Sequence, residues 1–362
     1  QTQRAVQNFT ISGQQMPEEF IQAVAMIKAS VAYANGELGH LNKSQTKAIE
    51  KAALEIVYGK FVDQFPVDVF QTGSGTSSNM NVNEVIAHLA QTNSKVKVHP
   101  NDHVNLGQSS NDVVPSAILL SSLRMVKMEL LPAVKKLQRT IDSKAVKLAK
   151  IVKTGRTHLM DAMPITMQQE LMAWSAQLSS AQQRFADSAK RLQYLPLGGT
   201  AVGTGLNADP KMPAIACRYI SKNFAVKVLP AKNKFESISA LDHIVELSGH
   251  CNSLAVCLMK ISNDLRWMNS GPLTGLSEIT LPALQPGSSI MPGKVNPVIP
   301  EAVAMVCSQV MGNHASITIA GQSGNFQLNV MMPLMANNIL QSLHLLSTAS
   351  EHLAEKAIAG FT

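Results

Sequence analysis

The sequence predicts an all-α protein built around a bundle of long helices, and three observations support this prediction. Aromatic residues make up only 4% of the 362 residues, whereas hydrophobic residues make up 45%. The apolar content is therefore rich in Ala, Leu and 18 Met, which suit helices better than the β-branched and aromatic residues of sheets do. The third observation is a set of long segments whose apolar residues recur at spacings of three and four, the period of one helix face.

Five segments predict the helices of the bundle. The clearest covers residues 244–268, where apolar side chains alternate spacings of three and four throughout. Two more seams cover residues 130–152 and 171–192, and further helices are expected at about residues 300–319 and 333–359. The apolar coverage of these helices is wide, so we expect several of their faces to be buried, some of them between subunits.

A region of shorter elements precedes the bundle and sets the expected domain division. We expect residues 1–106 to form a mainly helical N-terminal domain and residues 107–362 to form the central five-helix bundle domain. Pro17 is expected to begin a helix, because its fixed φ suits a first helical turn. The chain does not begin with Met, so the N-terminal domain is expected to be incomplete at its start.

Cysteine usage and hydropathy exclude several classes of protein. The four cysteines form no CxxC pair and have no clustered His partner, so neither a zinc site nor a disulfide framework is expected, and we predict no metal and no cofactor. Reduced, buried thiols are typical of an intracellular protein, either cytoplasmic or in the mitochondrial matrix. No apolar run is long enough to span a bilayer and the first residues are not a secretory signal, so no membrane association is expected.

The charge balance favours small anions over nucleic acid as ligands. The formal net charge is +7, but the basic residues are spread along helices without aromatic interleaving, as in residues 144–156. That distribution is typical of a solvated helical face, so a nucleic-acid-binding protein is the weakest interpretation. A mild positive bias also suits small anionic substrates.

The connections between the predicted helices carry most of the chemical information. Five of them are unusually rich in Gly, Ser, Thr and Asn, namely residues 73–81, 98–112, 153–164, 197–207 and 287–297. Any one of them could be an ordinary turn, but five such loops beside rigid helices favour a functional site. Hydroxyls, carboxamides and backbone N–H groups with few acids suit a bound carboxylate, and the phosphate-loop motif GxxxxGK[ST] is absent.

Two ionisable residues stand out as candidates for acid–base chemistry. His158 lies in the polar loop THLMDAMP rather than on a periodic helical face. A lone histidine is more often structural, but one paired with a carboxylate would be an acid–base catalyst with a raised pKa. Glu301 stands near the start of an apolar helix, where its charge suits the helix dipole. That placement is compatible with pairing to His158.

The loop sequences resemble those of the fumarase and aspartase superfamily. The resemblance rests on GSSIMPGKVNP, which looks like the superfamily signature, and on GSGTSSNMNVNEV, HPNDHVN, QSSND, GRTHLMDAMP and GGTAVGTGLN in the family's order. GRTHLMDA contains histidine where aspartases resemble GRTQLQDA, and GSGT stands where aspartases tend to show GAGT. The chain is therefore similar to the class II, iron-independent fumarases, and the resemblance implies reversible hydration of fumarate to (S)-malate through an aci-carboxylate intermediate.

The resemblance also implies roles for particular residues. Ser288 would remove the C3 proton of malate, and His158 paired with Glu301 would act on the departing hydroxyl. Residues implied to bind substrate are Ser74, Thr76, Ser109, Ser110, Asn111, Thr157, Lys294 and Asn296. His99, Asn101 and Asp102 match a secondary dicarboxylate site of the family, although the preceding KVKV lacks the arginine that some members place there.

The resemblance also carries an expectation about assembly. The resemblance implies a homotetramer whose bundle helices form a common core and whose active sites are shared between subunits. It also implies a small C-terminal domain, which we expect to be missing from the chain as given. Two alternatives stay open from the sequence: an aspartate ammonia-lyase of the same superfamily, and a catalytically silent structural protein on this scaffold, as the lens crystallins are.

Overall fold

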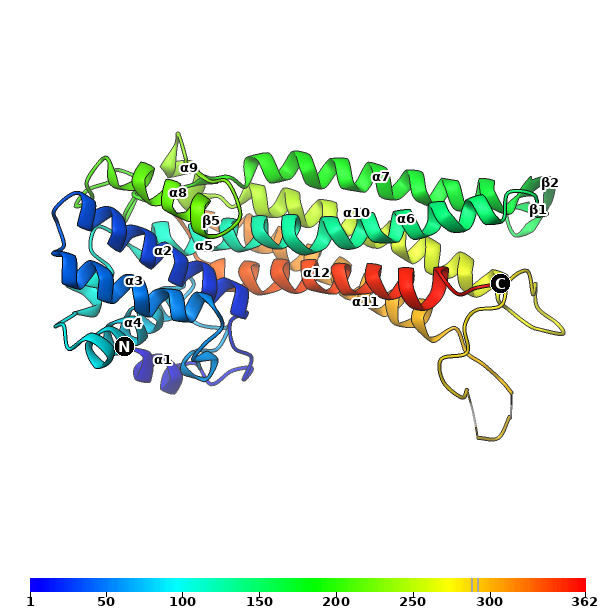
Figure 1. Cartoon of the computed structure of the whole chain (residues 1–362), viewed down its shortest axis with the longest axis horizontal. Coiled ribbons are helices and arrows are strands. Elements are labelled where there is room, and N and C mark those ends of the chain that lie inside the picture. The colour runs from blue at the N-terminus through cyan, green and yellow to red at the C-terminus, as the bar shows by residue number, and fades with distance from the viewer. Residues whose placement is uncertain (288, 292) are drawn as a thin grey trace. The chain divides into compact units, whose positions relative to one another are not determined.

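The structure, a computed structural model, describes residues 1–287, 289–291 and 293–362, and it confirms the predicted helical fold (Figure 1). The α-helices of the described chain are α1 Thr2–Asn8, α2 Glu18–Glu37, α3 Lys43–Val57, α4 Thr76–Ser94, α5 Ser110–Met125, α6 Leu131–Lys147, α7 Met167–Arg191, α8 Met212–Asn223, α9 Lys234–Ser239, α10 Asp242–Met268, α11 Val298–Gly321 and α12 Met332–Leu353. Short 3₁₀ or π turns are η1 Val62–Gln64, η2 Pro100–Val104, η3 Val126–Leu130 and η4 Ala354–Ile358.

The chain divides into two compact units. The first comprises Gln1–Met125, Ser188–Glu246 and Ala315–Gln341, and the second comprises Val126–Asp187, Leu247–His314 and Ser342–Thr362. Several of these boundaries fall inside long helices. The expected division into domains at residue 106 stays a prediction.

Helix α2 forms the centre of the first unit. Its side chains Phe20, Val24, Ile27 and Val31 are fully buried, as the spacing of apolar residues predicts. Pro17 directly precedes the helix as its N-cap. Helices α3, α5 and α8 pack against α2, so α2 is covered on several faces and contributes much of the apolar core.

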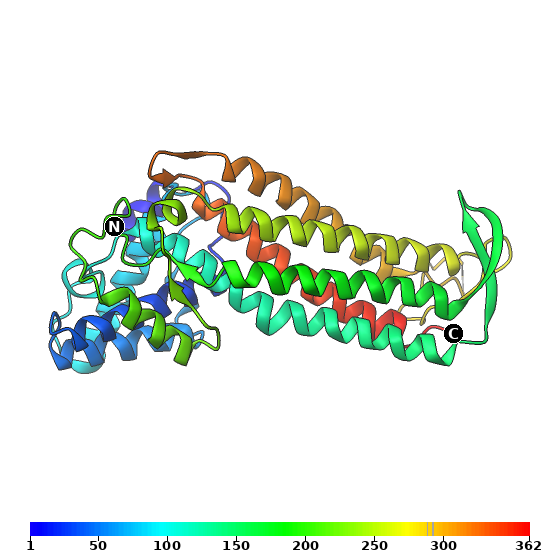
Figure 2. The same cartoon turned by 90° about the horizontal axis from the view of Figure 1, so that it is seen from above.

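Three long helices of the second unit run side by side, and Figures 1 and 2 show α6, α7 and α10 in this arrangement. Their predicted seams are buried, with Leu137, Trp174 and Leu258 each fully inaccessible. Polar bonds add to this packing, because the indole Nε1 of Trp174 donates to Asp264 Oδ2 at 3.2 Å. An amphipathic helix of this kind is held mainly by burial of its apolar stripe against its neighbours.

The strands are few and short in the described chain. They form three two-stranded sheets: antiparallel β1 Val152–Thr157 with β2 Met160–Thr166, parallel β3 Tyr194–Leu195 with β4 Leu229–Pro230, and antiparallel β5 Gly324–Asn325 with β6 Leu328–Asn329. None of the helices among the described residues is both long and apolar enough to cross a membrane.

The β1–β2 hairpin corrects two sequence-based expectations. The predicted helical seam continues to Val152, but α6 ends at Lys147 and Val152 is an exposed strand residue. Residues 153–164 were expected to form a loop, but they pair in antiparallel register, with Thr157 opposite Met160. The two residues at the tip adopt positive φ, which permits the tight two-residue turn that joins such strands.

Candidate active site

The described structure places the predicted catalytic and substrate-binding residues in three groups. The hydroxyl cluster, in the first unit, consists of Ser74, Thr76, Ser109, Ser110 and Asn111. In the second unit, the hairpin tip carries Thr157 and His158, and the lysine pocket contains Lys294, Asn296 and Glu301. Ser288 lies outside the described residues.

The hydroxyl cluster forms where the first turns of α4 and α5 approach each other. The Thr76 hydroxyl lies 2.7 Å from Ser74 Oγ and 2.8 Å from Ser110 Oγ. Gly75 precedes α4 with φ of 72°, and a Cβ there would lie 2.9 Å from the methyl groups of Val114. Hydroxyls that can rotate, set at helix N-termini, suit a small carboxylate ligand.

A buried carboxylate organises the loop that carries Ser109 and Asn111. Asp112 is fully buried, and its two oxygens accept from the backbone N–H groups of Ser109 at 3.0 Å and of Gly198 and Thr200 at 2.9 Å each. Burial raises the pKa of Asp112 to about 6, and these hydrogen bonds oppose the shift. The loop at 109–111 is thereby joined to the glycine-rich loop at 198–200.

The hairpin tip holds His158 in an exposed and specific conformation. His158 and Leu159 have φ of 57° and 61°, the pattern of a type I′ turn, which histidine tolerates better than most residues do. Both Thr157 and His158 are exposed. The imidazole is therefore presented away from its own chain, where it can meet groups that this chain does not supply.

Half-buried charges fix the base of the hairpin. The Lys153 ammonium lies 3.2 Å from Glu170 Oε2 and 3.1 Å from Glu278 Oε2, and Arg156 Nη1 lies 2.7 Å from Glu278 Oε1. The contact between Lys153 and Glu278 meets the distance for an ion pair, but Oε2 accepts no hydrogen bond of good geometry, so its attraction is mainly electrostatic. The cluster ties the hairpin to α7 and to the segment after α10.

The lysine pocket is a cavity of about 1010 Å³, and Lys294, Asn296 and Glu301 are among its lining residues. Gly287 N–H donates to the Lys294 carbonyl at 2.9 Å and closes the loop between them. Glu301 lies in the first turn of α11, as predicted. The pocket therefore combines a cation, an amide and a carboxylate, which is a suitable set for a polar, anionic substrate.

The described part of a single chain brings together only some of the predicted partners. The hydroxyls of Ser74, Thr76 and Ser110 do meet. Among the described residues, His158 and Glu301 make no recorded contact, so their pairing stays a prediction.

The residues of the predicted secondary site gather around η2. His99 Nδ1 accepts from the Asp102 backbone N–H at 3.2 Å and caps this turn. The Asp102 carboxylate is also 3.2 Å from the same nitrogen, but a nitrogen that accepts this N–H carries no proton to donate to the carboxylate. Asn101 is exposed beside them.

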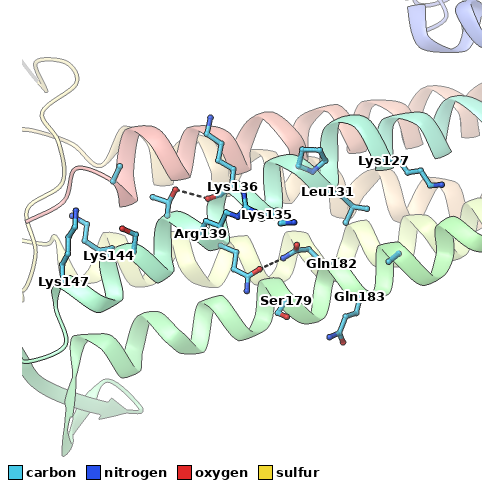
Figure 3. Close-up of a pocket in the computed structure, with 16 residues that line it drawn as sticks. Lys127, Leu131, Lys135, Lys136, Arg139, Lys144, Lys147, Ser179, Gln182 and Gln183 are labelled. Atoms are coloured by element: carbon cyan, nitrogen blue, oxygen red, sulfur yellow. Dashed lines mark hydrogen bonds between the residues drawn. The ribbon is translucent and has the colours of Figure 1, made fainter. Parts of the chain in front are cut away.

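A large basic groove lies elsewhere in the second unit, along α6 and α7 (Figure 3). Its volume is about 990 Å³, and its lining includes Lys127, Lys135, Lys136, Arg139, Lys144 and Lys147. Lys136 pairs with Glu355, and Lys144 donates to the Phe361 carbonyl at 2.6 Å. The lining contains none of the predicted site residues, and most of its cations are exposed, which is typical of a solvated helical face.

Comparison with known proteins identifies the family. A family model described as lyase matches residues 1–312. The chain is 61% identical to the class II fumarate hydratase of Xylella fastidiosa strain Temecula1, over 99% of this chain and 76% of that protein. This chain belongs to the class II fumarate hydratase family.

A second relative and a solved structure are also similar to this chain. The Pseudomonas aeruginosa protein named fumarate hydratase class II 2 is 54% identical over 100% of this chain and 79% of its own length. The crystal structure of a class II fumarase from Schistosoma mansoni is 38% identical and superposes with a TM-score of 0.95, covering 100% of this chain and 80% of that one.

Two buried residues beside the hydroxyl cluster of this class II fumarate hydratase were not predicted from the sequence. They are Asp112 and Lys28, a fully buried lysine in the middle of α2. A signal for each is visible in hindsight. Lys28 is the one cation in the apolar run AVAMIKASVAYA, and Asp112 directly follows three predicted substrate-binding residues.

Proposed function

We propose that this protein catalyses the reversible hydration of fumarate to (S)-malate. The observation that carries the proposal is the identity of 61%, over 99% of the chain, with a protein named class II fumarate hydratase. His158 in the hairpin GRTHLMDA adds support, because aspartases resemble GRTQLQDA at this position. The aspartate ammonia-lyase and the silent structural protein are therefore less favoured.

In this proposal the hydroxyl cluster binds one carboxylate of the substrate. Thr76, Ser109, Ser110 and Asn111 supply donors, with Ser74 orienting the Thr76 hydroxyl through the 2.7 Å contact between them. Helix N-termini and hydroxyls offer hydrogen-bond donors without a full positive charge. Such donors stabilise a carboxylate by directed hydrogen bonds, each of them typically worth about 3 kcal/mol when preorganised around a developing charge.

The difficult step is removal of the C3 proton of malate, because the resulting carbanion is adjacent to a carboxylate that is already charged. We propose that Lys294 and Asn296 stabilise this doubly charged aci-carboxylate, and that Ser288 takes the proton as an alkoxide. The glycine-rich loop supports this role, since small residues let backbone N–H groups approach an oxyanion.

At the other end of the substrate, His158 delivers a proton to the departing hydroxyl or activates water in the reverse direction, with Glu301 orienting its ring and Thr157 binding substrate beside it. His158 is exposed at the hairpin tip, and no hydrogen bond or ion pair joins it to Glu301 among the described residues. We therefore propose that the pair forms between subunits of a homotetramer, whose active sites are shared.

The surface of α11 supports this assembly. Met305 and Ile319 are 69% and 60% exposed on this helix, and Ala302 and Gly312 are also exposed on it. Small and apolar residues on an uncovered face favour close packing against other helices.

Two further assignments belong to the proposal. We propose that His99, Asn101 and Asp102 form a secondary dicarboxylate site, supported by their exposure around η2. We also propose a reducing compartment, either cytoplasm or mitochondrial matrix, because all four cysteines are unpaired and buried.

The test measures ultraviolet absorbance of the fumarate double bond. Purified protein receives malate in one cuvette and aspartate in the other, without added metal, and absorbance is expected to rise with malate alone. A rise with aspartate alone would identify an ammonia-lyase. Silence in both cuvettes would favour the structural protein.

A further inference from the structure

A buried cation lies in the first unit. Lys28, on α2, is fully inaccessible, and its ammonium donates to Asn105 Oδ1 at 2.8 Å and to Gln108 Oε1 at 3.0 Å. Burial of an ammonium is strongly unfavourable unless hydrogen bonds and an opposite charge compensate for lost hydration. A lysine retained at such a position is therefore expected to have a role beyond packing.

The same amide oxygen connects Lys28 to the helix that begins at the hydroxyl cluster. Asn83 Nδ2 lies 3.3 Å and Asn79 Nδ2 lies 3.5 Å from Asn105 Oδ1. Both asparagines are on α4, whose first residue is Thr76. Their own Oδ1 atoms are buried and accept no hydrogen bond among the described residues, so both side chains depend on Asn105 Oδ1 for their hydrogen bonds to the loop that contains it.

A buried anion secures the other side of the cluster. The Asp112 carboxylate joins the backbone of Ser109 to that of Gly198 and Thr200. The side chain of Asn111 reaches the same second loop, because its Nδ2 donates to the Ala201 carbonyl at 2.8 Å. Two loops far apart in sequence are thus held in one arrangement by a single carboxylate.

We propose that Lys28 and Asp112 are positioning residues, a pair of opposite buried charges that holds the hydroxyl cluster in the geometry that binds a substrate carboxylate. Lys28 holds Asn105, whose side chain in turn contacts asparagines of α4. Asp112 holds the loop that leads into α5. Both side chains are buried, so neither touches substrate. The proposal rests on the proposed function only in naming that substrate as fumarate or malate.

The charges themselves support a positioning role. The negative charge of Asp112 raises the pKa of Lys28 against the larger effect of burial, which lowers it to about 7. Lys28 therefore loses its proton as pH rises through about 7, and Asp112 gains one as pH falls through about 6. The two charges therefore coexist mainly between about pH 6 and about pH 7.

The experiment compares Asp112→Asn and Lys28→Met with the full-length wild-type protein. Asparagine keeps the shape of Asp112 but removes its charge and one of its acceptors, so the 109–111 and 198–200 loops lose a shared anchor. We expect KM for fumarate to rise roughly tenfold in each variant while kcat changes less than about twofold, since misplacement of binding groups weakens binding. The dissociation constant of succinate, an unreactive dicarboxylate, is expected to rise by the same factor in calorimetry.

The control variant is Ser121→Ala, on the same helix as Asp112. Ser121 is buried, and its hydroxyl bonds only to carbonyls of its own helix, Ala117 at 2.7 Å and Ile118 at 3.2 Å. Its removal is expected to lower the unfolding temperature without changing KM. An unchanged KM and succinate affinity in either folded variant of the pair would overturn the proposal.

The pH profile separates positioning from general stability. In the wild type KM is expected to rise above about pH 7, where Lys28 becomes neutral. In Lys28→Arg, which keeps its charge, this rise is expected to disappear. The same rise in wild type and in Lys28→Arg would overturn the role of Lys28. If wild-type protein fails to turn over fumarate, the proposed function fails, whereas succinate binding still decides the positioning role.

Discussion

At the scale of single residues, His158 illustrates how backbone and chemistry are combined. Its φ of 57° and that of Leu159, 61°, form the turn that presents the imidazole. Side chains that tolerate left-handed backbone, such as Asn, can replace His158 without loss of the turn. The chemical role can therefore be removed without removing the conformation.

The variant His158→Asn is expected to fold normally and to lose about 10²- to 10⁴-fold in kcat, the usual contribution of one positioned acid or base. Steady-state hydration of fumarate and the thermal unfolding temperature are the two measurements. Leu159→Asn changes the neighbouring turn position in the same way and is expected to keep its activity. Equal losses in both variants would mean that the turn, rather than the imidazole, carries the effect.

Residues on loops could be predicted from the sequence, whereas buried residues that act through others could not. His158 and the hydroxyl residues belong to short motifs whose chemistry is readable locally. Lys28 contacts Asn105, which lies 77 positions further along the chain. No local pattern contains that pairing, because it is created only when α2 packs against the loop that leads into α5.

At the scale of elements, the loop between Gly287 and Lys294 depends on one close approach. A Cβ built on Gly287 would lie 2.4 Å from the Lys294 carbonyl oxygen, which is backbone and cannot rotate away. The N–H of Gly287 bonds to the same oxygen at 2.9 Å. A side chain at this position therefore forces the loop ends apart.

The variant Gly287→Ala is expected to reduce kcat/KM at least about tenfold, because displacement of Lys294 disturbs the substrate-binding geometry. The unfolding temperature is expected to change little, since residues 289–291, 293 and 294 of the loop are exposed. Gly249→Ala serves as the control, because a Cβ there would meet only His314 at 3.8 Å, an ordinary contact. Full activity of Gly287→Ala would show that the closure of the loop is not required.

The helices could be predicted because the local spacing of apolar residues marks their buried faces. The β1–β2 hairpin could not be predicted in this way. A two-stranded hairpin is marginal by itself, and here its base is held by Glu278, which lies 122 positions from Arg156. The strand pairing also shifts register between Thr154 and Arg156. The two strands also show no regular alternation of buried and exposed residues, so the sequence contains little sign of them.

At the scale of the whole molecule, the uncovered face of α11 is the surface through which we propose that the subunits pack. Met305, an apolar residue on a strongly apolar helix, is 69% exposed. The breadth of apolar surface was predictable from the sequence, but the number of subunits was not, since that depends on the angles at which identical surfaces close on each other.

If the proposed tetramer forms through this face, the variant Met305→Glu is expected to shift the protein to smaller species, because a carboxylate buried between helices loses its hydration without gaining a partner. Light scattering coupled to size-exclusion chromatography measures the mass, and fumarate hydration in the same fractions is expected to be lost with it. The matched control is Val146→Glu, on the polar face of α6, where Val146 is 70% exposed. This variant is expected to keep the mass and the activity of the wild type. A dissociated but fully active Met305→Glu would exclude shared active sites.

The burial of the four cysteines has a consequence for durability. Burial raises the pKa of every one of these thiols, to about 12 for Cys217 and Cys307 and to about 11 for Cys257. The thiolate is the form that attacks peroxide and disulfide reagents, and these side chains scarcely populate it at neutral pH. We therefore expect the four cysteines to oxidise slowly during storage, and oxidation to begin instead at exposed methionines such as Met163.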